Sequence, residues 1–336
     1  MRAWHVVRYG EPDDVLHLVD VDDPPAPGPG QVLVGVRAVA VNFPDVLLAR
    51  GQYQERPPLP FVPGIELCGE VRAVGDGVAH VAVGDRVVGS RIGVLAEQAL
   101  LGADEVWPCP PELSDAEAAG FVIAYQTAWF ALHRRASLQP GETVLVTAAA
   151  GGVGTATVQL AVAAGARVVA VVGSAAKADA ARAAGAHVVV DRSTQDVVAA
   201  VREATGGAGA DVVVDPVGGD AFEAATRCVA FEGRVVVVGF AAGTIQDVRA
   251  GHALVKNYGV LGLHWALYAR RRPDLVRAAH RALSALVASG AVRPVVSDVV
   301  AFADAPDAVA RLAAGGTTGR LVVAVASGAD GAGGAR

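Results

Sequence analysis

The sequence contains little cysteine. Only three cysteines, Cys68, Cys109 and Cys228, occur in 336 residues, and no two of them form a C-x-x-C pair. Thiolate metal sites and disulfide-stabilised small domains both need several cysteines at short, regular spacings. The sequence therefore supports neither a disulfide framework nor a cysteine-based zinc site.

Long apolar runs and an excess of positive charge are missing too. No apolar run approaches the ~18 residues that cross a bilayer. Residues 1–14, MRAWHVVRYGEPDD, are interrupted by charge and lack the apolar core of a secretory signal. The formal net charge is −6, whereas nucleic-acid-binding domains usually present a basic surface. We therefore expect a cytoplasmic protein with no membrane or nucleic-acid partner, in which a local basic pocket could still hold one anionic cofactor.

The first third of the chain has the pattern of a small β domain. Residues 31–42, 65–75 and 84–89 are rich in β-branched residues and are bounded by Gly, Pro and Asp. Proline-rich connectors occupy 24–30 and 55–64. Short strands separated by such turns predict a barrel-like domain.

From about residue 125, strands alternate with helices. Six Val-rich runs are predicted strands: 143–147, 167–172, 187–190, 211–215, 234–239 and 258–263. Ala-rich helical stretches lie between most of them, at 152–164, 175–184, 195–204 and 220–230, while 247–257 is ambiguous. This alternation predicts an α/β domain with a parallel sheet covered on both faces, and six strands is the number in the doubly wound Rossmann fold.

The remainder of the chain is predicted to return to the first domain. A helix at 273–289, a strand at 294–300, a helix at 305–314 and a strand at 320–325 follow residue 266. The predicted division is therefore a discontinuous β-rich domain, 1–124 with 266–336, and a dinucleotide-binding domain, 125–265. The glycine-rich tail, 327–336, is expected to be disordered.

The segment VTAAAGGVGTATVQLA, at 146–161, has the pattern of a phosphate-binding loop. Ala149, Gly151 and Gly154 occupy the three glycine positions of G-x-G-x-x-G, with Ala in place of the first. A lone glycine-rich loop is a weak signal, but a strand before it and a helix after it strengthen it. Gly151 allows close approach of a pyrophosphate, and Gly154 allows the helix to pack on the strand. The helix N-terminus adds N–H groups and a positive dipole.

The residues after the second strand of this domain favour NADPH over NADH. An NAD site carries Asp or Glu there, whereas this chain has Gly173 and Ser174. Lys177, one of only two lysines in the chain, lies close by, and Arg192 follows the third strand. Without a carboxylate to repel it, a 2′-phosphate suits these cations. A solvated helix face and loop are the alternative explanation for Lys177 and Arg192.

These segments resemble the medium-chain dehydrogenase/reductases, and among them the zinc-independent NADPH:quinone oxidoreductase (zeta-crystallin-like) branch. The resemblance covers nearly the whole chain and is carried by 40–53 (AVNFPDVLLARGQY), 60–71 (PFVPGIELCGEV), 122–132 (VIAYQTAWFAL), 141–161, 171–186, 211–219 (DVVVDPVGG) and 256–265 (KNYGVLGLHW). It implies a GroES-like catalytic domain made from both chain ends, a Rossmann domain between them, and a cleft where the two meet.

The comparison with zinc-dependent relatives also implies that no metal is used. Those relatives place Cys at the first ligand position, where this chain has Asn42, and His-Glu after a Pro-Gly, where residues 63–66 read Pro-Gly-Ile-Glu. The four-cysteine structural lobe is missing, and the eight histidines form no H-x-x-x-H pair. Without nitrogen or sulfur ligands at these places, Lewis-acid alcohol oxidation is unsupported.

An acceptor that needs no metal is one already activated by conjugation, such as a quinone or an α,β-unsaturated carbonyl. The resemblance implies that Thr127 lies near the nicotinamide, and that His264 and Trp265 line the cleft, although Trp265 is equally explained as a core residue. The full predicted set of cofactor contacts is Thr127, Ala150, Gly151, Gly152, Val153, Gly154, Gly173, Ser174, Lys177, Arg192, Val217, Gly239, Phe240, His264 and Trp265. A homodimer is common among the relatives.

Asn42 and Tyr53 are the candidates for a direct catalytic role. Asn42 is placed to bond near the nicotinamide ribose or the substrate carbonyl, or else to cap the helix that begins near Phe43. Tyr53, in RGQYQ, matches the Tyr of a similar G-x-Y in related enoyl-thioester reductases, where it is thought to donate a proton during hydride addition. The alternative is a loop tyrosine that shapes the pocket.

Three functions stay open on this basis. The first is a metal-free and flavin-free NADPH-dependent reductase of quinones or α,β-unsaturated carbonyls. The second is an enoyl-thioester or polyketide-tailoring enoyl reductase that uses Tyr53 as its proton donor. The third, from a different class, is an NADPH-binding structural or sensory protein with little catalysis, because a fold by itself does not determine function.

Overall fold

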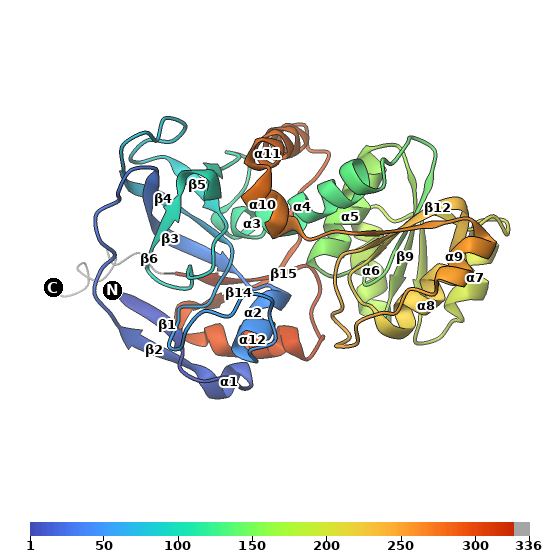
Figure 1. Cartoon of the computed structure of the whole chain (residues 1–336), viewed down its shortest axis with the longest axis horizontal. Coiled ribbons are helices and arrows are strands. Elements are labelled where there is room, and N and C mark those ends of the chain that lie inside the picture. The colour runs from blue at the N-terminus through green and yellow to red at the C-terminus, as the bar shows by residue number, and fades with distance from the viewer. Residues whose placement is uncertain (326–336) are drawn as a thin grey trace. The chain divides into compact units, whose positions relative to one another are not determined.

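The computed structural model describes residues 1–325 and divides the chain into two compact units (Figure 1). One unit comprises Met1–Ile123 and the described residues from Val296 onward, and the other comprises Ala124–Val295. None of the helices in the described part of the chain combines the length and the apolar character that a bilayer crossing requires. The predicted tail, 327–336, lies outside the described residues.

The first unit is built mainly from β-strands. They are β1 (Arg2–Val6), β2 (Leu16–Asp20), β3 (Gln31–Ala40), β4 (Leu67–Val74), β5 (Arg86–Gly89), β6 (Gln98–Gly102), β7 (Val106–Pro108), β14 (Val296–Ala301) and β15 (Arg320–Ala324). Its α-helices are α1 (Pro12–Val15), α2 (Phe43–Ala49), α3 (Asp115–Ala119) and α12 (Ala305–Ala313). Short 3₁₀ turns occupy Ala103–Glu105 and Phe302–Asp304.

Strand β3 is the centre of this unit. The large sheet has the order β14-β15-β3-β4-β5-β7, with β6 also paired to β3, and β1 and β2 form a separate antiparallel pair. Val32, Val34 and Val36 of β3 are buried in the apolar core of the unit. The late strand β15 pairs antiparallel with the C-terminal end of β3, Val322 opposite Ala40. Segments from both ends of the chain therefore share one sheet and one core.

The second unit is a parallel α/β structure. Its strands are β8 (Thr143–Val146), β9 (Arg167–Val172), β10 (Val188–Asp191), β11 (Ala210–Asp215), β12 (Val229–Val237) and β13 (Gly259–Gly262). Its helices are α5 (Gly152–Ala163), α6 (Ala175–Ala183), α7 (Val197–Ala204), α8 (Gly219–Cys228), α9 (Ala250–Lys256), α10 (Trp265–Arg271) and α11 (Pro273–Ala288). Helix α4 (Val122–Trp129) and a π-helical segment (Phe130–Arg135) precede β8.

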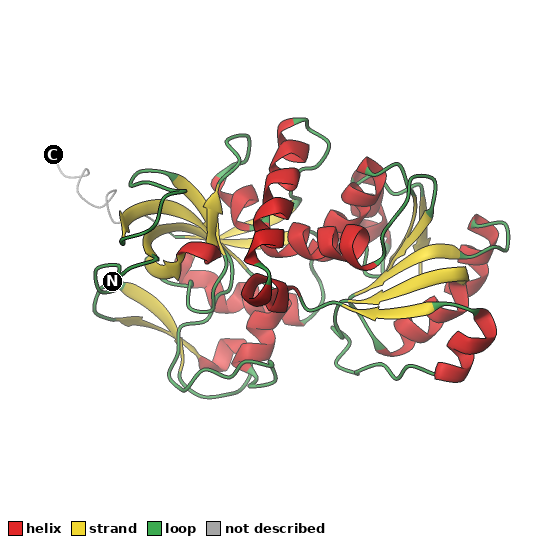
Figure 2. Ribbon diagram, turned by 45° about the horizontal axis from the view of Figure 1, so that its top comes forward, coloured by secondary structure: helices red, strands yellow, loops and turns green. Residues whose placement is uncertain are grey.

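The six strands are all parallel and lie in the order β10-β9-β8-β11-β12-β13. Helices α5 and α6 pack together on one face of the sheet, and α7 and α8 on the other (Figures 1 and 2). Strand residues such as Val169 and Val213 are completely buried, as an apolar strand covered from both sides requires. The predicted six-stranded, doubly wound sheet is confirmed.

The segment 266–295 lies in the second unit, whereas the sequence placed it with the first domain. Three contacts hold it there: the Trp265 indole bonds to Gln126 of α4, the Tyr268 ring packs on Phe130 with 4.4 Å between centroids, and Arg293 shares two backbone hydrogen bonds with the Gln159 side chain of α5. Strand–helix alternation carries no signal for such side-chain contacts. The bounds of the functional domains stay a prediction.

Gly154 is required where α5 meets the loop after β8. A Cβ atom at this position would lie 2.2 Å from the carbonyl oxygen of Ala148 and 2.7 Å from the Cα of Ala149. Both obstacles are backbone atoms, which cannot rotate away. The predicted role of Gly154, close packing of helix on strand, therefore agrees with the local geometry.

Gly154→Ala is expected to lower the free energy of unfolding by about 3 kcal/mol, because the added methyl overlaps fixed backbone. The matched control is Gly251→Ala in α9, where a Cβ meets no atom within 4 Å. That change should leave stability the same or raise it by up to about 1 kcal/mol, since alanine is the better helix former. Urea unfolding of the three proteins measures both effects. Equal stability of Gly154→Ala and the unmodified chain would contradict the close-packing account.

Candidate functional site

The glycine-rich loop leaves β8 and opens directly into α5. Gly151 is the N-cap of this 12-residue helix. A Cβ atom on Gly151 would meet only the Ala148 carbonyl oxygen, at 3.4 Å. The space beside the Gly151 Cα is therefore otherwise free of protein atoms within 4 Å. Ala150 is buried, whereas residues 151–153 are partly exposed. The first N–H groups of a helix have no intrahelical acceptor, so this turn can hold an anion.

Asp215, at the end of β11, fixes the neighbouring loop. Its buried carboxylate accepts a hydrogen bond from the Thr147 hydroxyl at 2.5 Å, which joins the ends of β8 and β11. It also accepts from the backbone N–H groups of Val217 and Gly218, each at 3.1 Å. Burial raises the pKa of Asp215, and these three donors oppose that rise. Asp215 is not among the predicted site residues, although an acid that closes the run VVVD was a visible signal.

Two basic residues, Lys177 and Arg192, follow β9 and β10. The Ser174 hydroxyl caps α6 by accepting from the Lys177 backbone N–H at 3.4 Å. A Cβ on Gly173 would lie 3.3 Å from Nη2 and 3.4 Å from Nε of Arg192, so this guanidinium lies against Gly173. Within residues 1–325 the Arg192 side chain makes no hydrogen bond or ion pair. The structure thus brings Gly173, Ser174 and Arg192 together, with Lys177 in the first turn of α6.

The other predicted cofactor residues of this unit follow β12 and β13. In a parallel sheet these carboxyl ends lie at the same edge as the glycine loop. A Cβ on Gly239 would lie 3.3 Å from the Pro216 carbonyl oxygen, so the loops after β11 and β12 touch, and Phe240 comes next. His264 is exposed, whereas Trp265 is only 9% exposed.

Trp265 is a buried residue with a specific partner. Its indole Nε1–H donates to Oε1 of Gln126 at 3.0 Å. Gln126 is completely buried, and Thr127, the next residue of α4, is buried too. The alternative of a core role for Trp265 therefore has direct support. Gln126 is not among the predicted site residues, and its only signal in the sequence was a polar residue in an otherwise apolar stretch.

In the first unit, every hydrogen-bond donor of Asn42 has a partner. Its Nδ2 group donates to the Ala40 carbonyl and to Oε2 of Glu66, both at 3.0 Å, and its Oδ1 accepts from Nη1 of Arg320 at 2.9 Å. Its side chain makes no capping bond to α2. Instead the Asp45 carboxylate accepts from the Asn42 backbone N–H at 2.7 Å. A direct role of Asn42 toward a ligand stays a prediction, and only the Oδ1 atom has an unused lone pair for it.

Glu66 and Arg320 form an ion pair inside this unit. Their side chains are 0% and 6% exposed, and Nη2 of Arg320 donates to Oε2 of Glu66. The other carboxylate oxygen, Oε1, accepts from the Ile123 backbone N–H at 2.7 Å, at the start of α4. Burial raises the pKa of Glu66, while the Arg320 charge and the Asn42 amide oppose the rise. The pair joins segments that lie 254 positions apart, which no local motif could reveal.

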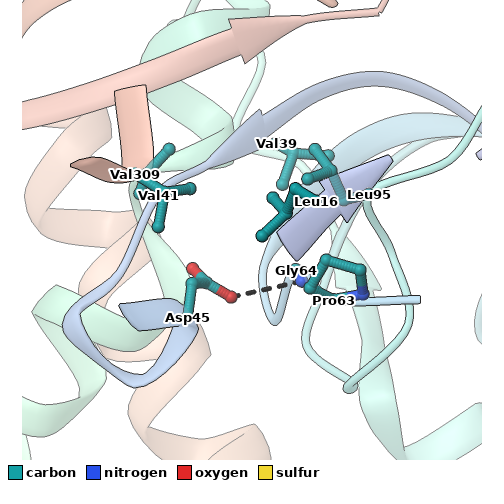
Figure 3. Close-up of a pocket in the computed structure, with 8 residues that line it drawn as sticks. All are labelled: Leu16, Val39, Val41, Asp45, Pro63, Gly64, Leu95 and Val309. Atoms are coloured by element: carbon teal, nitrogen blue, oxygen red, sulfur yellow. Dashed lines mark hydrogen bonds between the residues drawn. The ribbon is translucent and has the colours of Figure 1, made fainter. Parts of the chain in front are cut away.

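Asp45 (Figure 3) is a second buried acid of this unit, and the charges of Arg320 and Glu66 act on it. It lines a small pocket whose other walls are Leu16, Val39, Val41, Pro63, Gly64, Leu95 and Val309. Its Oδ1 accepts from the Gly64 backbone N–H at 3.2 Å. Burial raises its pKa to about 7, against the lowering effects of the Asn42 N–H, the Arg320 charge and the Gly64 N–H.

Tyr53 lies in the loop after α2. Its ring is half-buried and packs against the apolar core of the first unit. The chain turns just before it at Gly51, which has a φ of 66°. A Cβ there would lie 2.8 Å from the ring of Tyr9, so Gly51 is required by both conformation and space. The proton-donor role of Tyr53 stays a prediction.

Two family models match the chain. The alcohol dehydrogenase GroES-like domain matches residues 28–115, and the zinc-binding dehydrogenase domain matches residues 152–282. Despite the second name, the described residues contain no group of three or more His, Cys, Asp or Glu side chains arranged to hold a metal ion.

Known proteins resemble the chain over almost its whole length. It is 40% identical to quinone oxidoreductase-like protein 2 of Bos taurus, across 88% of this chain and 86% of the relative. It is 35% identical to quinone oxidoreductase of Pseudomonas aeruginosa, across 94% and 97%. The crystal structure of Escherichia coli quinone oxidoreductase complexed with NADPH superposes with a TM-score of 0.89 at 30% identity, covering 96% of this chain and all of that one.

The chain belongs to the medium-chain dehydrogenase/reductases, in the zinc-independent quinone oxidoreductase branch, and it is an enzyme of the GroES-like plus Rossmann architecture. The predicted family is confirmed.

Asp45 is expected to make stability depend on pH. Below about pH 4 the Asp45 carboxyl is protonated in both the folded and the unfolded chain, so it adds no pH dependence to the free energy of unfolding. Between about pH 4 and 7 the unfolded chain ionises at this residue while the folded chain keeps its proton, because the folded pKa is about 7 instead of 3.8. Its contribution to unfolding free energy therefore falls as pH rises through this window, by on the order of 4 kcal/mol, and is constant above it.

Urea unfolding between pH 4 and 8 tests this dependence with Asp45→Asn. The difference in stability between the variant and the unmodified chain should shift in favour of the variant as pH rises to 7. The matched control, Asp179→Asn, removes a carboxylate that is 80% exposed and should show no such trend. A difference for Asp45→Asn that stays constant across the range would refute the raised pKa.

Proposed function

We propose that the chain is an NADPH-dependent reductase, free of metal and flavin, that reduces quinones or α,β-unsaturated carbonyls by hydride transfer. The observation that carries the choice of cofactor is the arrangement of residues that follow β9 and β10. Gly173 and Ser174 stand there in place of the acid that would select NADH. The Arg192 guanidinium lies against Gly173, and within residues 1–325 it makes no hydrogen bond or ion pair, although its charge acts on the neighbouring Asp191. A guanidinium is well suited to a 2′-phosphate, which a carboxylate would repel.

The glycine-rich turn fits the rest of such a cofactor. Gly151 leaves the outer side of the turn open, and the start of α5 offers N–H groups to a pyrophosphate. Asp215 holds the neighbouring loop, which contains Val217, in one conformation. NADPH, when bound, supplies the hydride, and this chain supplies binding and orientation. A solved relative, E. coli quinone oxidoreductase, is described as complexed with NADPH, which supports the assignment.

The buried ion pair supports chemistry without a metal. Asn42 stands where zinc-dependent relatives place a metal-binding Cys, and Ile65-Glu66 stands where they place His-Glu. The Asn42 and Glu66 side chains are both bonded to the Arg320 guanidinium. A guanidinium keeps its charge at all physiological pH values, so its positive charge opposes a divalent cation at the same place. Without a Lewis acid, the acceptor must already be electron-poor, as quinones and conjugated carbonyls are.

An enoyl-thioester reductase is the second candidate, and Tyr53 is the residue that favours it. A phenol can protonate the carbon next to a carbonyl as enolate charge develops. A quinone needs no such donor, because its reduced oxygen takes a proton readily from water. The two candidates therefore differ in how strongly they depend on the Tyr53 hydroxyl.

We further propose a homodimer in which the β13 edges of two chains pair. Strand β13 ends the sheet and, within residues 1–325, has only β12 as a neighbour. An uncovered edge strand presents unpaired backbone groups that a second copy can satisfy. On α9, Leu254 and Val255 are 76% and 80% exposed. Sedimentation at micromolar concentration should give twice the chain mass, and a monomer would contradict it.

The cytoplasmic location stays a prediction.

A screen of NADPH oxidation against 1,4-quinones, 2-alkenals and enoyl-CoA esters tests the function. We expect turnover with quinones or alkenals in the absence of added metal or flavin. Tyr53→Phe should leave quinone turnover within about twofold, since no proton donor is needed. A fall of about 100-fold with an enoyl-CoA ester would favour the second candidate instead. Binding of NADPH without oxidation by any acceptor would indicate a structural or sensory protein and overturn both.

A further inference from the structure

Gln126 carries a buried amide whose orientation is fixed. The side chain is completely buried in α4, and its Oε1 accepts the Trp265 indole N–H at 3.0 Å. An indole nitrogen can only donate, so the atom that faces it must be the amide oxygen. The Nε2 group, with two N–H donors, therefore faces away from Trp265.

This Nε2 group has no hydrogen-bond partner among the described residues, although it is shielded from solvent. Burying an amide without a partner is costly, and the great majority of buried polar atoms in folded proteins are bonded. Gln126 also contrasts with the other glutamine of this region. Gln159 of α5 accepts from the Tyr125 hydroxyl and the Arg293 N–H and donates to the Arg293 carbonyl, so both polar atoms of its amide have partners.

The unpartnered amide lies near the edge of the sheet that the glycine loop occupies. Trp265, its partner, comes only three residues after the end of β13, and the carboxyl ends of the parallel strands share one edge. Tyr125, the preceding residue of α4, is bonded to α5, the helix that begins at the glycine loop. Because Gln159 lies in the second half of α5, the contact that places Gln126 at this edge is the one with Trp265.

We propose that Gln126 Nε2 donates a hydrogen bond to a carbonyl oxygen of the bound reactants, either the carboxamide of the nicotinamide or the carbonyl of the acceptor. The assignment rests on the proposed reductase function. A neutral amide suits this task, because it donates without transferring a proton. On an acceptor carbonyl the donor strengthens as negative charge develops on the oxygen during reduction. Trp265 acts through Gln126 as a positioning residue, because it prevents the amide from turning over.

The test compares Gln126→Met, which keeps the length of the side chain and removes its polar atoms, with Gln159→Met as the matched control. Both variants lose side-chain hydrogen bonds, buried at Gln126 and more exposed at Gln159, and both should melt at lower temperature. Only Gln126→Met should change ligand binding or turnover. Trp265→Phe keeps the amide but frees it to turn, and should give a smaller change of the same kind. The readouts are the melting temperature, the Kd for NADPH by fluorescence titration, and kcat and KM with a 1,4-quinone and a 2-alkenal.

The two sources of the carbonyl give different results. If the carboxamide is the acceptor of the bond, the Kd for NADPH rises about tenfold in Gln126→Met while kcat stays close to the unmodified value. If the substrate carbonyl accepts it, the Kd is unchanged and kcat falls about tenfold or more. Either result supports the proposal. A Gln126→Met enzyme whose Kd, kcat and KM match those of Gln159→Met would overturn it and assign Gln126 a purely structural role.

Failure of this proposal can be distinguished from failure of the proposed function. An unmodified enzyme that reduces quinones, with a Gln126→Met variant that behaves like the control, leaves the function intact and refutes the role of Gln126. An unmodified chain that reduces no acceptor, but whose NADPH affinity falls in Gln126→Met, refutes the function and keeps the contact. A chain that neither binds NADPH nor reduces any acceptor refutes both.

Discussion

The ion pair between Arg320 and Glu66 is the interaction on which the first unit depends. Arg320 begins a strand from the C-terminal part of the chain, Glu66 directly precedes β4, and Asn42 directly precedes α2. One guanidinium thus connects three segments that are distant in sequence, and Glu66 also holds the start of α4 through Ile123. A buried ion pair contributes little net stability, but loss of one partner leaves an unpaired buried charge and costs about 3–5 kcal/mol. The same contacts occupy every hydrogen-bond donor of Asn42, and they place a permanent cation beside this residue, which stands where zinc-dependent relatives have a metal-binding Cys.

The second unit depends on close contacts at the carboxyl edge of its sheet. Gly154 lets α5 begin against the loop after β8, and Asp215 fastens the loop after β11 to the end of β8. Gly173 makes room for the Arg192 guanidinium after the next strand. The two glycines leave space because they have no side chain, and Asp215 fixes the loop after β11 by accepting from its backbone N–H groups. Together they shape this edge of the sheet so that it can receive an anionic cofactor.

Much of the second unit could be predicted because its signals are local. Strand–helix alternation from β8 to β13 and the spacing of Gly151 and Gly154 determine the sheet and its phosphate loop. The contacts made by Arg320, Asp45 and Gln126 could not be predicted, because each depends on partners that come together only in the folded chain. Asn42 illustrates the difference. Its position in the sequence indicated a ligand contact or a helix cap, whereas its side chain is committed to Glu66 and Arg320. The sequence likewise contained no signal for the side-chain contacts of Trp265, Tyr268 and Arg293, which hold the segment 266–295 in the second compact unit.

The central claim is that the Arg320 cation, and not a metal ion, occupies the polar centre of the first unit while the enzyme reduces an activated acceptor. The most direct measurement is the metal content of the purified, active enzyme by mass spectrometry, together with its quinone reductase rate before and after treatment with a strong zinc chelator. The account predicts far less than one zinc ion per chain and an unchanged rate. One zinc ion per chain, with activity that is lost on chelation and restored by added zinc, would contradict it.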